Sequence, residues 1–168
     1  DDLITLVQTS GDINRWANTS KRKGYGAELE VDYKPKDQLR LLANYSYQKS
    51  IDDETNEYVG DAPNHQVYFR AEWKVVDKWL FSPQINWVGK QERVPEDALR
   101  TESVKHYTTV DLTIKQLNVV ENLDMTLSVH NFFDRKYQEP SPISSLGGIA
   151  ADLPMPGRSI YGELSFNF

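Results

Sequence analysis

The feature that most constrains this chain is the alternation of apolar and polar residues along most of its length. In the segments 25–34, 39–48 and 67–75, every second residue is apolar and the residues between are mostly polar or charged. A period of two places these two sets on opposite faces of an extended strand. The same pattern recurs in 79–87, 108–115, 123–130 and 159–168, and the chain opens on the extended segment 2–9. The sequence predicts an all-β, antiparallel protein of about eight strands.

The connections between these strands differ in length in a regular way. Tight turns are expected at "KPKD", around Asp77 and Lys78, and at "VVEN". Long loops are expected at Ser10 to Lys23, Ser50 to His65, Gly89 to His106 and Tyr137 to Gly157. Long loops without structure are uncommon in compact soluble domains, whereas short turns at one end and long loops at the other are typical of outer-membrane barrels.

Aromatic residues on the apolar faces are sorted by height. Those near the tight-turn end are Tyr33, Trp73, Trp79 and Phe168, and those near the long-loop end are Tyr25, Tyr45, Tyr47, Trp87 and Phe133. Aliphatic residues such as Leu29, Ala71 and Leu127 lie between these two sets. A bilayer has two interfaces that favour aromatic rings and a hydrocarbon layer between them. The sequence therefore predicts a transmembrane β-barrel segment whose apolar face meets lipid, with short periplasmic turns and long extracellular loops.

Composition is consistent with this fold and excludes several functions. Hydrophobic residues make up 39% of the 168 residues, and no run of 18 apolar residues is present. Barrel strands alternate, so they give no such run. The net charge of −6 without a basic stripe argues against nucleic acid as a partner. The absence of cysteine excludes disulfide scaffolds and cysteine-based metal sites, and we expect no cofactor.

Four segments carry a family resemblance. They are "GYGAELEV" (24–31), "DAPNHQ" (61–66), "NFFDRKY" (131–137) and "PGRSIYGELSFNF" (156–168). In this order and spacing they resemble the C-terminal part of TonB-dependent outer-membrane receptors. The positions that match the motifs of the last two segments are Asn131, Phe133, Asp134, Tyr137, Pro156, Gly157 and Arg158.

The resemblance implies a barrel of about 22 strands with a plug domain in its lumen. It implies an active-transport protein and not an enzyme, in the outer membrane of a Gram-negative bacterium. The substrate implied is a scarce nutrient, above all a ferric siderophore or another metal chelate, and the TonB complex supplies the energy. Residues 1–168 show no plug, no TonB box and no signal peptide, so we expect them to be the C-terminal barrel part of a longer receptor.

Two other architectures are compatible with the same alternation. A self-contained outer-membrane barrel of eight strands, with a structural or adhesive role, requires its first and last strands to pair. A soluble lipocalin-like binding barrel requires the apolar face to point inward.

Individual residues suggest further roles. His65 and His106 near the long-loop end, with Tyr68 and Arg70 on the polar face, are the candidate ligand contacts. The final strand resembles a signal for the barrel-assembly machinery, carried by Leu164, Phe166 and Phe168. The charges on the polar face are expected to pair with one another or to contact a plug; they include Glu30, Arg40, Arg70, Glu72 and Lys74.

The remaining partners expected from the sequence are outer-membrane lipid and lipopolysaccharide, the latter near the acidic loop 52–61. Ser128, His130 and Asp111 contain the residue types of a hydrolase triad. Ser128 and His130 lie two residues apart on one strand, with no nucleophile elbow, so they do not indicate an enzyme.

Overall fold

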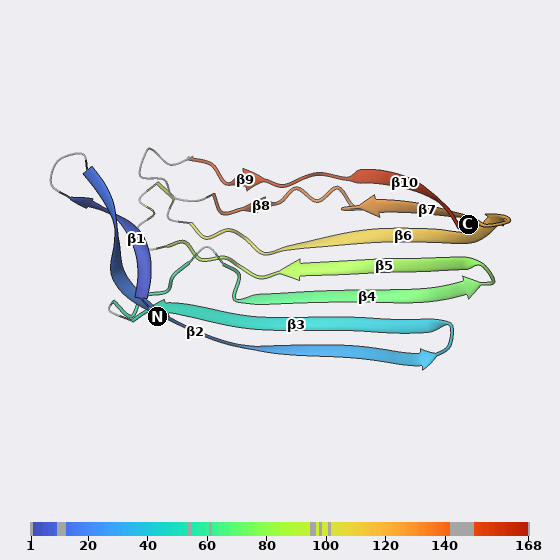
Figure 1. Ribbon diagram of the computed structural model, residues 1–168, viewed down its shortest axis with the longest axis horizontal. Helices are drawn as coiled ribbons and strands as arrows, with labels where there is room; N and C mark the ends of the chain where they lie inside the picture. Colours follow the sequence, from blue (N-terminus) through green and yellow to red (C-terminus); the bar gives the residue numbers. More distant parts are fainter. Residues whose placement is uncertain are drawn as a thin grey trace.

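The chain folds into one antiparallel sheet. We describe it from a computed structural model, for residues 2–9, 13–53, 55–60, 62–94, 97, 99–100, 102–141 and 150–167. In this part of the chain, eight strands pair in the order β1-β2-β3-β4-β5-β6-β7-β10, and β8 and β9 form a separate two-stranded pair (Figure 1). The strands are β1 (Asp2–Thr9), β2 (Ile13–Lys36), β3 (Leu39–Asp52), β4 (His65–Val76), β5 (Trp79–Val88), β6 (Tyr107–Val120), β7 (Leu123–His130), β8 (Gln138–Glu139), β9 (Leu153–Pro154) and β10 (Ser159–Phe166).

The two ends of the sheet have different connections, as predicted. The turns β2–β3, β4–β5 and β6–β7 lie together at one end, where the chain also ends (Figure 1). Lys78 and Asn122 adopt positive φ angles of 65° and 62°, which closes two of these turns within two residues. The connections 53–64, 89–106 and 131–158 lie at the opposite end, which we call the loop end. Within the described residues, no helix is long and apolar enough to cross a bilayer.

One predicted loop is wrong. The segment 13–23, expected within the loop Ser10 to Lys23, belongs to β2, which runs for 24 residues. Its first half pairs with β1, from Thr9↔Ile13 to Asp2↔Lys21, and its second half pairs with β3. The segment is polar and lacks alternation, so its own residues did not indicate a strand; pairing with β1 imposes the extended conformation. Residues 10–12 lie outside the described part.

Pro83 lies inside β5, where a proline was expected to weaken the strand. On the β6 side it remains in register, opposite Leu112. On the β4 side the pairing is interrupted between Arg70↔Gln84 and Trp73↔Phe81, and it resumes in the same register. Proline has no N–H to donate, so the ladder loses bonds at this position without a shift of the strand.

The apolar face of the sheet is exposed instead of packed. Leu29, Ile160 and Leu164 are 61%, 65% and 69% exposed. Among the described residues, the buried hydrophobic side chains are Val88, Val104 and Tyr107, all near the loop end. A soluble barrel would bury its apolar face inward, so this arrangement disfavours the lipocalin-like alternative. Hydrocarbon is the medium that an exposed apolar face of this kind requires.

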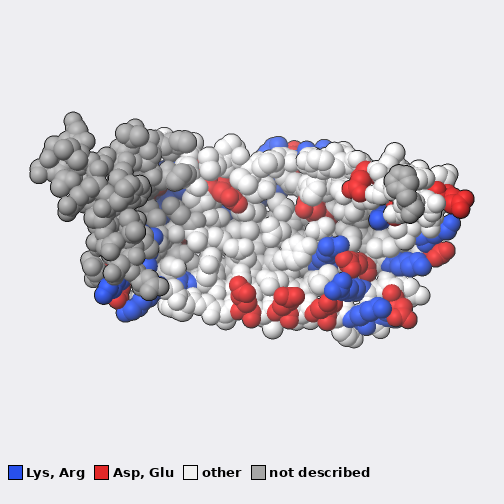
Figure 2. Space-filling model, viewed as in Figure 1, with Lys and Arg blue, Asp and Glu red and all other residues white. Residues whose placement is uncertain are grey.

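The opposite face carries ion pairs that cross from strand to strand. Arg40 on β3 lies 2.6 Å from Asp32 on β2 and 3.7 Å from Glu72 on β4. Glu72 also accepts a contact of 2.6 Å from Arg70. Figure 2 shows such oppositely charged groups side by side. The expected pairing of the inward charges is seen here, and Lys74 pairs with Asp77 at the turn, 2.9 Å away.

The edges of the sheet bear on the self-contained barrel. In the described residues, β1 pairs with β2 and β10 pairs with β7, at opposite ends of the strand order. The strand pairing that an eight-stranded barrel requires, between first and last strands, is not present among them.

We predict that the two faces respond differently to a charge at the same height. Leu29→Arg, midway between Tyr25 and Tyr33, should destabilise the folded natural protein in lipid by about 2–4 kcal/mol, because the guanidinium meets hydrocarbon. Glu28→Arg, one residue away on the polar face, should cost far less. The free energy of unfolding in vesicles checks this, and equal effects of both variants would contradict a lipid-facing assignment.

Candidate ligand-binding vestibule at the loop end

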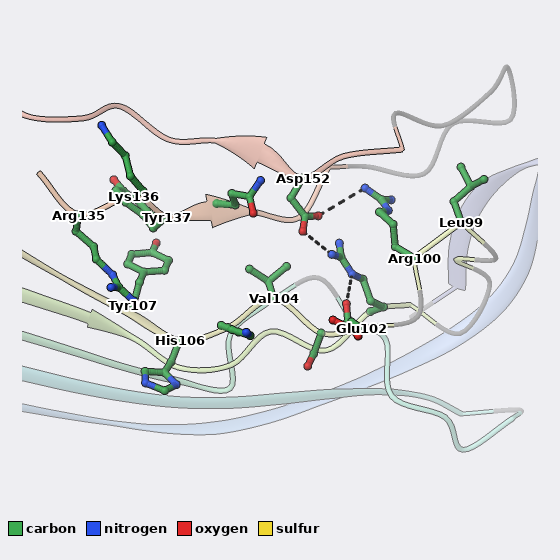
Figure 3. Close-up of a pocket in the computed structure, with 14 residues that line it drawn as sticks. Leu99, Arg100, Glu102, Val104, His106, Tyr107, Arg135, Lys136, Tyr137 and Asp152 are labelled. Atoms are coloured by element: carbon green, nitrogen blue, oxygen red, sulfur yellow. Dashed lines mark hydrogen bonds and ion pairs between the residues drawn. The ribbon is translucent and has the colours of Figure 1, made fainter.

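A cavity of about 550 Å³ opens at the loop end of β6, between the loop 89–106 and the segment that follows β7. We call it the vestibule (Figure 3). Its lining residues are Arg93, Leu99, Arg100, Glu102, Ser103, Val104, Lys105, His106, Tyr107, Arg135, Lys136, Tyr137, Gln138 and Asp152. They come from separate loops, so the vestibule exists only when these loops lie against one another.

Two arginines hold the loops together. Arg93 lies 2.7 Å from Asp152 Oδ2 and donates from Nε to the carbonyl oxygen of Glu102 at 2.9 Å. Arg100 lies 3.8 Å from Asp152 Oδ1 and donates to Ser141. The Arg93 and Arg100 side chains are only 8% and 7% exposed. Charges as buried as these require partners, so the pairs fix the loop 89–106 against the segment around Asp152 (Figure 3).

Asp97 fixes the conformation of the loop next to Arg100. Its carboxylate accepts bonds of 3.1 Å from the backbone N–H groups of Leu99 and Arg100, and it pairs with the Arg100 guanidinium at 2.8 Å. Burial acts to raise the pKa of Asp97, but the backbone bond from Arg100 and its charge outweigh it. The pKa therefore lies below its ordinary value of 3.8, and the carboxylate stays charged at neutral pH.

Two tyrosines whose rings are tilted by 35° to each other line the vestibule next to the sheet. The ring centroids of Tyr107 and Tyr137 are 4.3 Å apart, and the Tyr107 hydroxyl donates to Glu139 at 3.0 Å. Burial, then the nearby charge of Glu139, raises the pKa of Tyr137. Tyr137 therefore keeps its phenolic proton, and the two rings offer aromatic surface and neutral hydroxyl groups to a ligand.

Among the residues that line the vestibule, cationic side chains outnumber carboxylates. Its cations are Arg93, Arg100, Lys105, Arg135 and Lys136, and its carboxylates are Glu102 and Asp152. Lys136 is engaged by Asp134 at 3.1 Å. In the described part of the chain, no ion pair involves Lys105 or Arg135, and both side chains are exposed. These two residues are free to meet an anionic ligand.

The structure separates the ligand contacts expected from the sequence. His106 lines the vestibule. His65 lies among tyrosines, with Nδ1 2.8 Å from the Tyr45 hydroxyl and its ring 5.0 Å from that of Tyr47. Because Tyr45 and Tyr47 belong to the apolar face, His65 points away from the vestibule. The two histidines are therefore not brought together.

Tyr68 and Arg70 lie on the polar face of β4, outside the vestibule. The Tyr68 hydroxyl donates to Gln84 Oε1 at 3.0 Å, and Arg70 pairs with Glu72. They remain candidate contacts for a ligand that has passed the vestibule.

Two of the three residues expected to carry an assembly signal lie on β10. Leu164 and Phe166 are 69% and 55% exposed on one face of β10, near the tight-turn end. Phe168 lies outside the described residues.

The motif residues after β7 act as a clamp. Buried Asn131, with a φ of 48°, accepts a bond from the Arg135 N–H at 2.8 Å and donates to the carbonyl oxygens of Arg135 and Pro156, at 2.9 and 3.3 Å. Asp134 accepts the Arg158 N–H at 2.9 Å. The two ends of the loop 131–158 are thereby joined before β10 begins. Phe133 is 72% exposed and has an edge-to-face contact with Phe132.

Sequence reasoning did not find the two arginines and Asp152. Arg93 and Arg100 lie in a polar loop without periodicity, and Asp152 is 59 residues beyond Arg93. No local pattern links such residues. Tyr137, a motif position, was the one residue of this region that the sequence analysis had named beside His106.

The Ser128, His130 and Asp111 set does not form a triad. His130 Nδ1 lies 3.3 Å from Asp111 Oδ2, but the Ser128 hydroxyl lies 3.1 Å from that of Thr113. Among the described residues, no hydrogen bond joins the Ser128 hydroxyl to a histidine that could act as its base.

The paired strands and the exposed apolar face are those of a segment of an outer-membrane β-barrel, with the vestibule at its loop end. A family described as "TonB dependent receptor-like, beta-barrel" matches residues 1–132. The chain belongs to the TonB-dependent receptor family. This family consists of outer-membrane transport receptors of Gram-negative bacteria, not of enzymes, and it serves the uptake of siderophores, haem and metals.

Curated relatives are similar at moderate identity. The heme/hemopexin utilization protein C of Haemophilus influenzae is 28% identical over 148 residues, which are 82% of this chain and 21% of that protein. The metal-pseudopaline receptor CntO of Pseudomonas aeruginosa is 27% identical over 149 residues, 83% of this chain and 20% of that receptor. The chain thus spans about a fifth of the length of these relatives.

Solved structures share the fold. The ferric enterobactin receptor PfeA superposes with a TM-score of 0.82 at 21% identity, over 99% of this chain and 27% of that one. The copper transporter OprC superposes with a TM-score of 0.79 at 18% identity, over 99% of this chain and 28% of that one. The ferripyoverdine receptor of Pseudomonas aeruginosa superposes with a TM-score of 0.73 at 20% identity, over 92% of this chain and 20% of that one.

We predict that the clamp has no room for a side chain at Gly157. A Cβ there would lie 2.8 Å from Asp134 Oδ1, so Gly157→Ala should push the carboxylate off the Arg158 N–H and cost about 1–3 kcal/mol. Gly162→Ala on β10 is the control, because no atom lies within 4 Å of its Cβ position. The free energy of unfolding of the natural protein in detergent distinguishes them. Similar values for both would show that the clamp tolerates a methyl group.

We also predict that acid loosens the loop next to Arg100. Because the pKa of Asp97 is lowered in the folded state, its stabilising bonds are complete at neutral pH and are lost as pH falls through that lowered pKa, below about 3.8. Hydrogen exchange at the amides of Leu99 and Arg100, corrected for intrinsic rates, should show protection falling in that range. With Asp97→Asn, protection should not depend on pH. Protection that persists in acid would contradict the role of this carboxylate.

Proposed function

We propose that residues 1–168 form the C-terminal barrel part of a receptor that imports a metal chelate across the outer membrane. In this proposal other parts of the natural protein supply the remaining strands, the plug domain and the contact with the TonB complex. The proposal is supported by the matched share of the relatives, about a fifth of their length. Two edges of the sheet without partners among the described residues support it as well.

The observation that carries the proposal is the charge of the vestibule. It opens at the loop end, where a ligand from outside the cell arrives, and five cationic side chains outnumber two carboxylates in its lining. A chelate that holds its metal through several anionic oxygens is attracted to such a site, because like-signed charges around a cleft focus the field and raise the association rate. The Tyr107 and Tyr137 rings suit an aromatic or planar part of the ligand.

The names of the similar proteins support the same class of substrate. They include receptors for heme/hemopexin, metal-pseudopaline, ferripyoverdine and ferric enterobactin. Metal carried by a small organic molecule is common to these names. We therefore propose an anionic metal chelate, with a ferric siderophore as the first compound class to test.

The proposal includes a transport step that is compatible with the arrangement of the sheet. The loops around the vestibule capture the chelate, and its release into the lumen brings it to the polar face, where Tyr68 and Arg70 lie. The plug supplied by the rest of the receptor blocks the lumen until the TonB complex displaces it. The metal needs no protein ligand, because its carrier already occupies its coordination positions.

We predict that reversing the two unpaired cations of the vestibule impairs capture. Lys105→Glu with Arg135→Glu in the natural receptor should lower the association rate of the transported chelate by about tenfold or more, through loss of electrostatic attraction. Lys90→Glu is the control, because Lys90 lies in the same loop and pairs with Glu92 outside the vestibule. Uptake of radiolabelled iron by cells offered a panel of ferric siderophores measures the effect. Unchanged uptake by a surface-displayed double variant would overturn the proposed site.

A further inference from the structure

The loop 53–64 lies against the loop 89–106 but does not line the vestibule. None of its described residues is among those that border the cavity. Pro63 forms an antiparallel bridge with Gln91, and Gln91 forms a second one with Val104. These three residues follow one another in the order of β4, β5 and β6. The pairing of the sheet therefore continues for a short distance into the two loops.

Gly60 is a point of very close approach between the two loops. The register of the Pro63↔Gln91 bridge, continued by three residues, places Gly60 opposite Val94. A Cβ on Gly60 would lie 2.3 Å from Val94 N and 2.4 Å from the Arg93 carbonyl carbon. Gly60 also has a φ of 62°, which glycine adopts without steric cost. Both the contact and the backbone conformation require glycine at this position.

The peptide group that Gly60 contacts carries one of the two arginines that hold the vestibule together. Arg93 pairs with Asp152 at 2.7 Å and donates to the Glu102 carbonyl oxygen at 2.9 Å (Figure 3). Its side chain is 8% exposed, so water compensates little for a lost contact. Both contacts depend on the position of the Arg93 backbone, because the guanidinium must stay within hydrogen-bond distance of two oxygens. Displacement of the 93–94 peptide would therefore weaken both contacts.

The loop 53–64 is held from its other side by β3. The Val59 N–H donates to the Ser50 carbonyl oxygen at 3.0 Å, and the Gln48 N–H donates to that of Asn64 at 2.9 Å. The chain is thus bonded to the sheet on both sides of Gly60. If Gly60 carried a side chain, the 93–94 peptide would have to move, because the loop 53–64 is anchored.

We propose that Gly60 is a positioning residue of the vestibule. It supports the 93–94 peptide and thereby sets the position of the Arg93 guanidinium against Asp152. The proposal rests on the ligand-capture role proposed above for the vestibule. The loop 53–64 then takes part in ligand capture without contact with the ligand, and its effect reaches the cavity through Arg93.

Substitutions at Gly60 in the natural receptor test this assignment, with ferric enterobactin and ferripyoverdine as probes. Gly60→Ala should weaken binding of a chelate that the receptor takes by about tenfold or more, because a buried guanidinium loses its partner. Gly60→Asn should weaken it as much, since asparagine tolerates a positive φ but its Cβ meets the same peptide. Gly24→Ala is the control and should bind as the unmodified receptor does, because its Cβ would meet nothing closer than Ser50 Oγ at 3.4 Å.

A double variant tests whether Gly60 acts through Arg93. Asp152→Asn removes the carboxylate charge that pairs with Arg93, and it should weaken binding on its own. Gly60→Ala added to Asp152→Asn should then change the affinity by less than about twofold, because both substitutions disrupt the same pair. A further loss as large as that of Gly60→Ala alone would show that Gly60 acts elsewhere, and it would overturn the proposal.

A measurement without ligand separates this proposal from the proposed function. Nitroxide labels on Glu92→Cys and Leu153→Cys, two exposed positions next to Arg93 and Asp152, are placed in a natural receptor free of other cysteines. Dipolar broadening between the labels should fall with Gly60→Ala and persist in the control variant. If neither probe binds the unmodified receptor, the choice of ligand is wrong and the labels alone decide. The proposal is overturned if the broadening is unchanged in the Gly60→Ala variant, shown to be folded by heat-modifiable migration on gels, or if Gly60→Asn restores chelate binding.

Discussion

The backbone hydrogen-bond ladder is the interaction on which the rest of this structure depends. Hydrocarbon offers no partner to a peptide N–H or C=O, so each spanning strand must satisfy its polar groups on both neighbours. The strands β3 to β7 have a paired neighbour on both sides, and at Pro83 some bonds are lost without a slip in register. A slip by one residue would turn Leu29 toward the lumen and Glu28 toward lipid. The division into an oily face and a charged face therefore rests on the register of the ladder.

The apolar and the polar face of the sheet contribute to stability in different ways. Without a conventional core, side-chain packing contributes little to holding β2, β3 and β4 together, and the charges of Asp32, Arg40 and Glu72 bridge them on the polar side. At the loop end, side-chain pairs rather than a backbone ladder hold the chain in place. There the chain is surrounded by water, and the buried Arg93, Arg100 and Asp152 pairs order loops that have no regular ladder of their own.

Sequence alone predicted the parts of the fold that local physics determines. Alternation along 39–48 and 67–75 located β3 and β4, because the period of two is a property of each strand by itself. The turns at Asp77 and Glu121 were equally local. The start of β2 was not predictable in this way, because residues 13–21 become a strand only through pairing with β1. The contact between Arg93 and Asp152 joins residues 59 positions apart, and one sequence contains no signal for such a meeting. His65 and His106 both lie near the loop end in sequence, but His65 contacts Tyr45 and Tyr47 while His106 lines the vestibule, and a separation of this kind has no local signal.

The clamp formed by Asn131 and Asp134 has an effect on how such a protein changes over generations. It joins the two ends of the segment 131–158 at its base, so β10 starts from the same position whatever the residues in between. Insertions and replacements at the tip then carry a small entropic cost and leave the register of the closing strand intact. The residues of this loop can therefore vary between related proteins while the membrane-spanning strands keep their register.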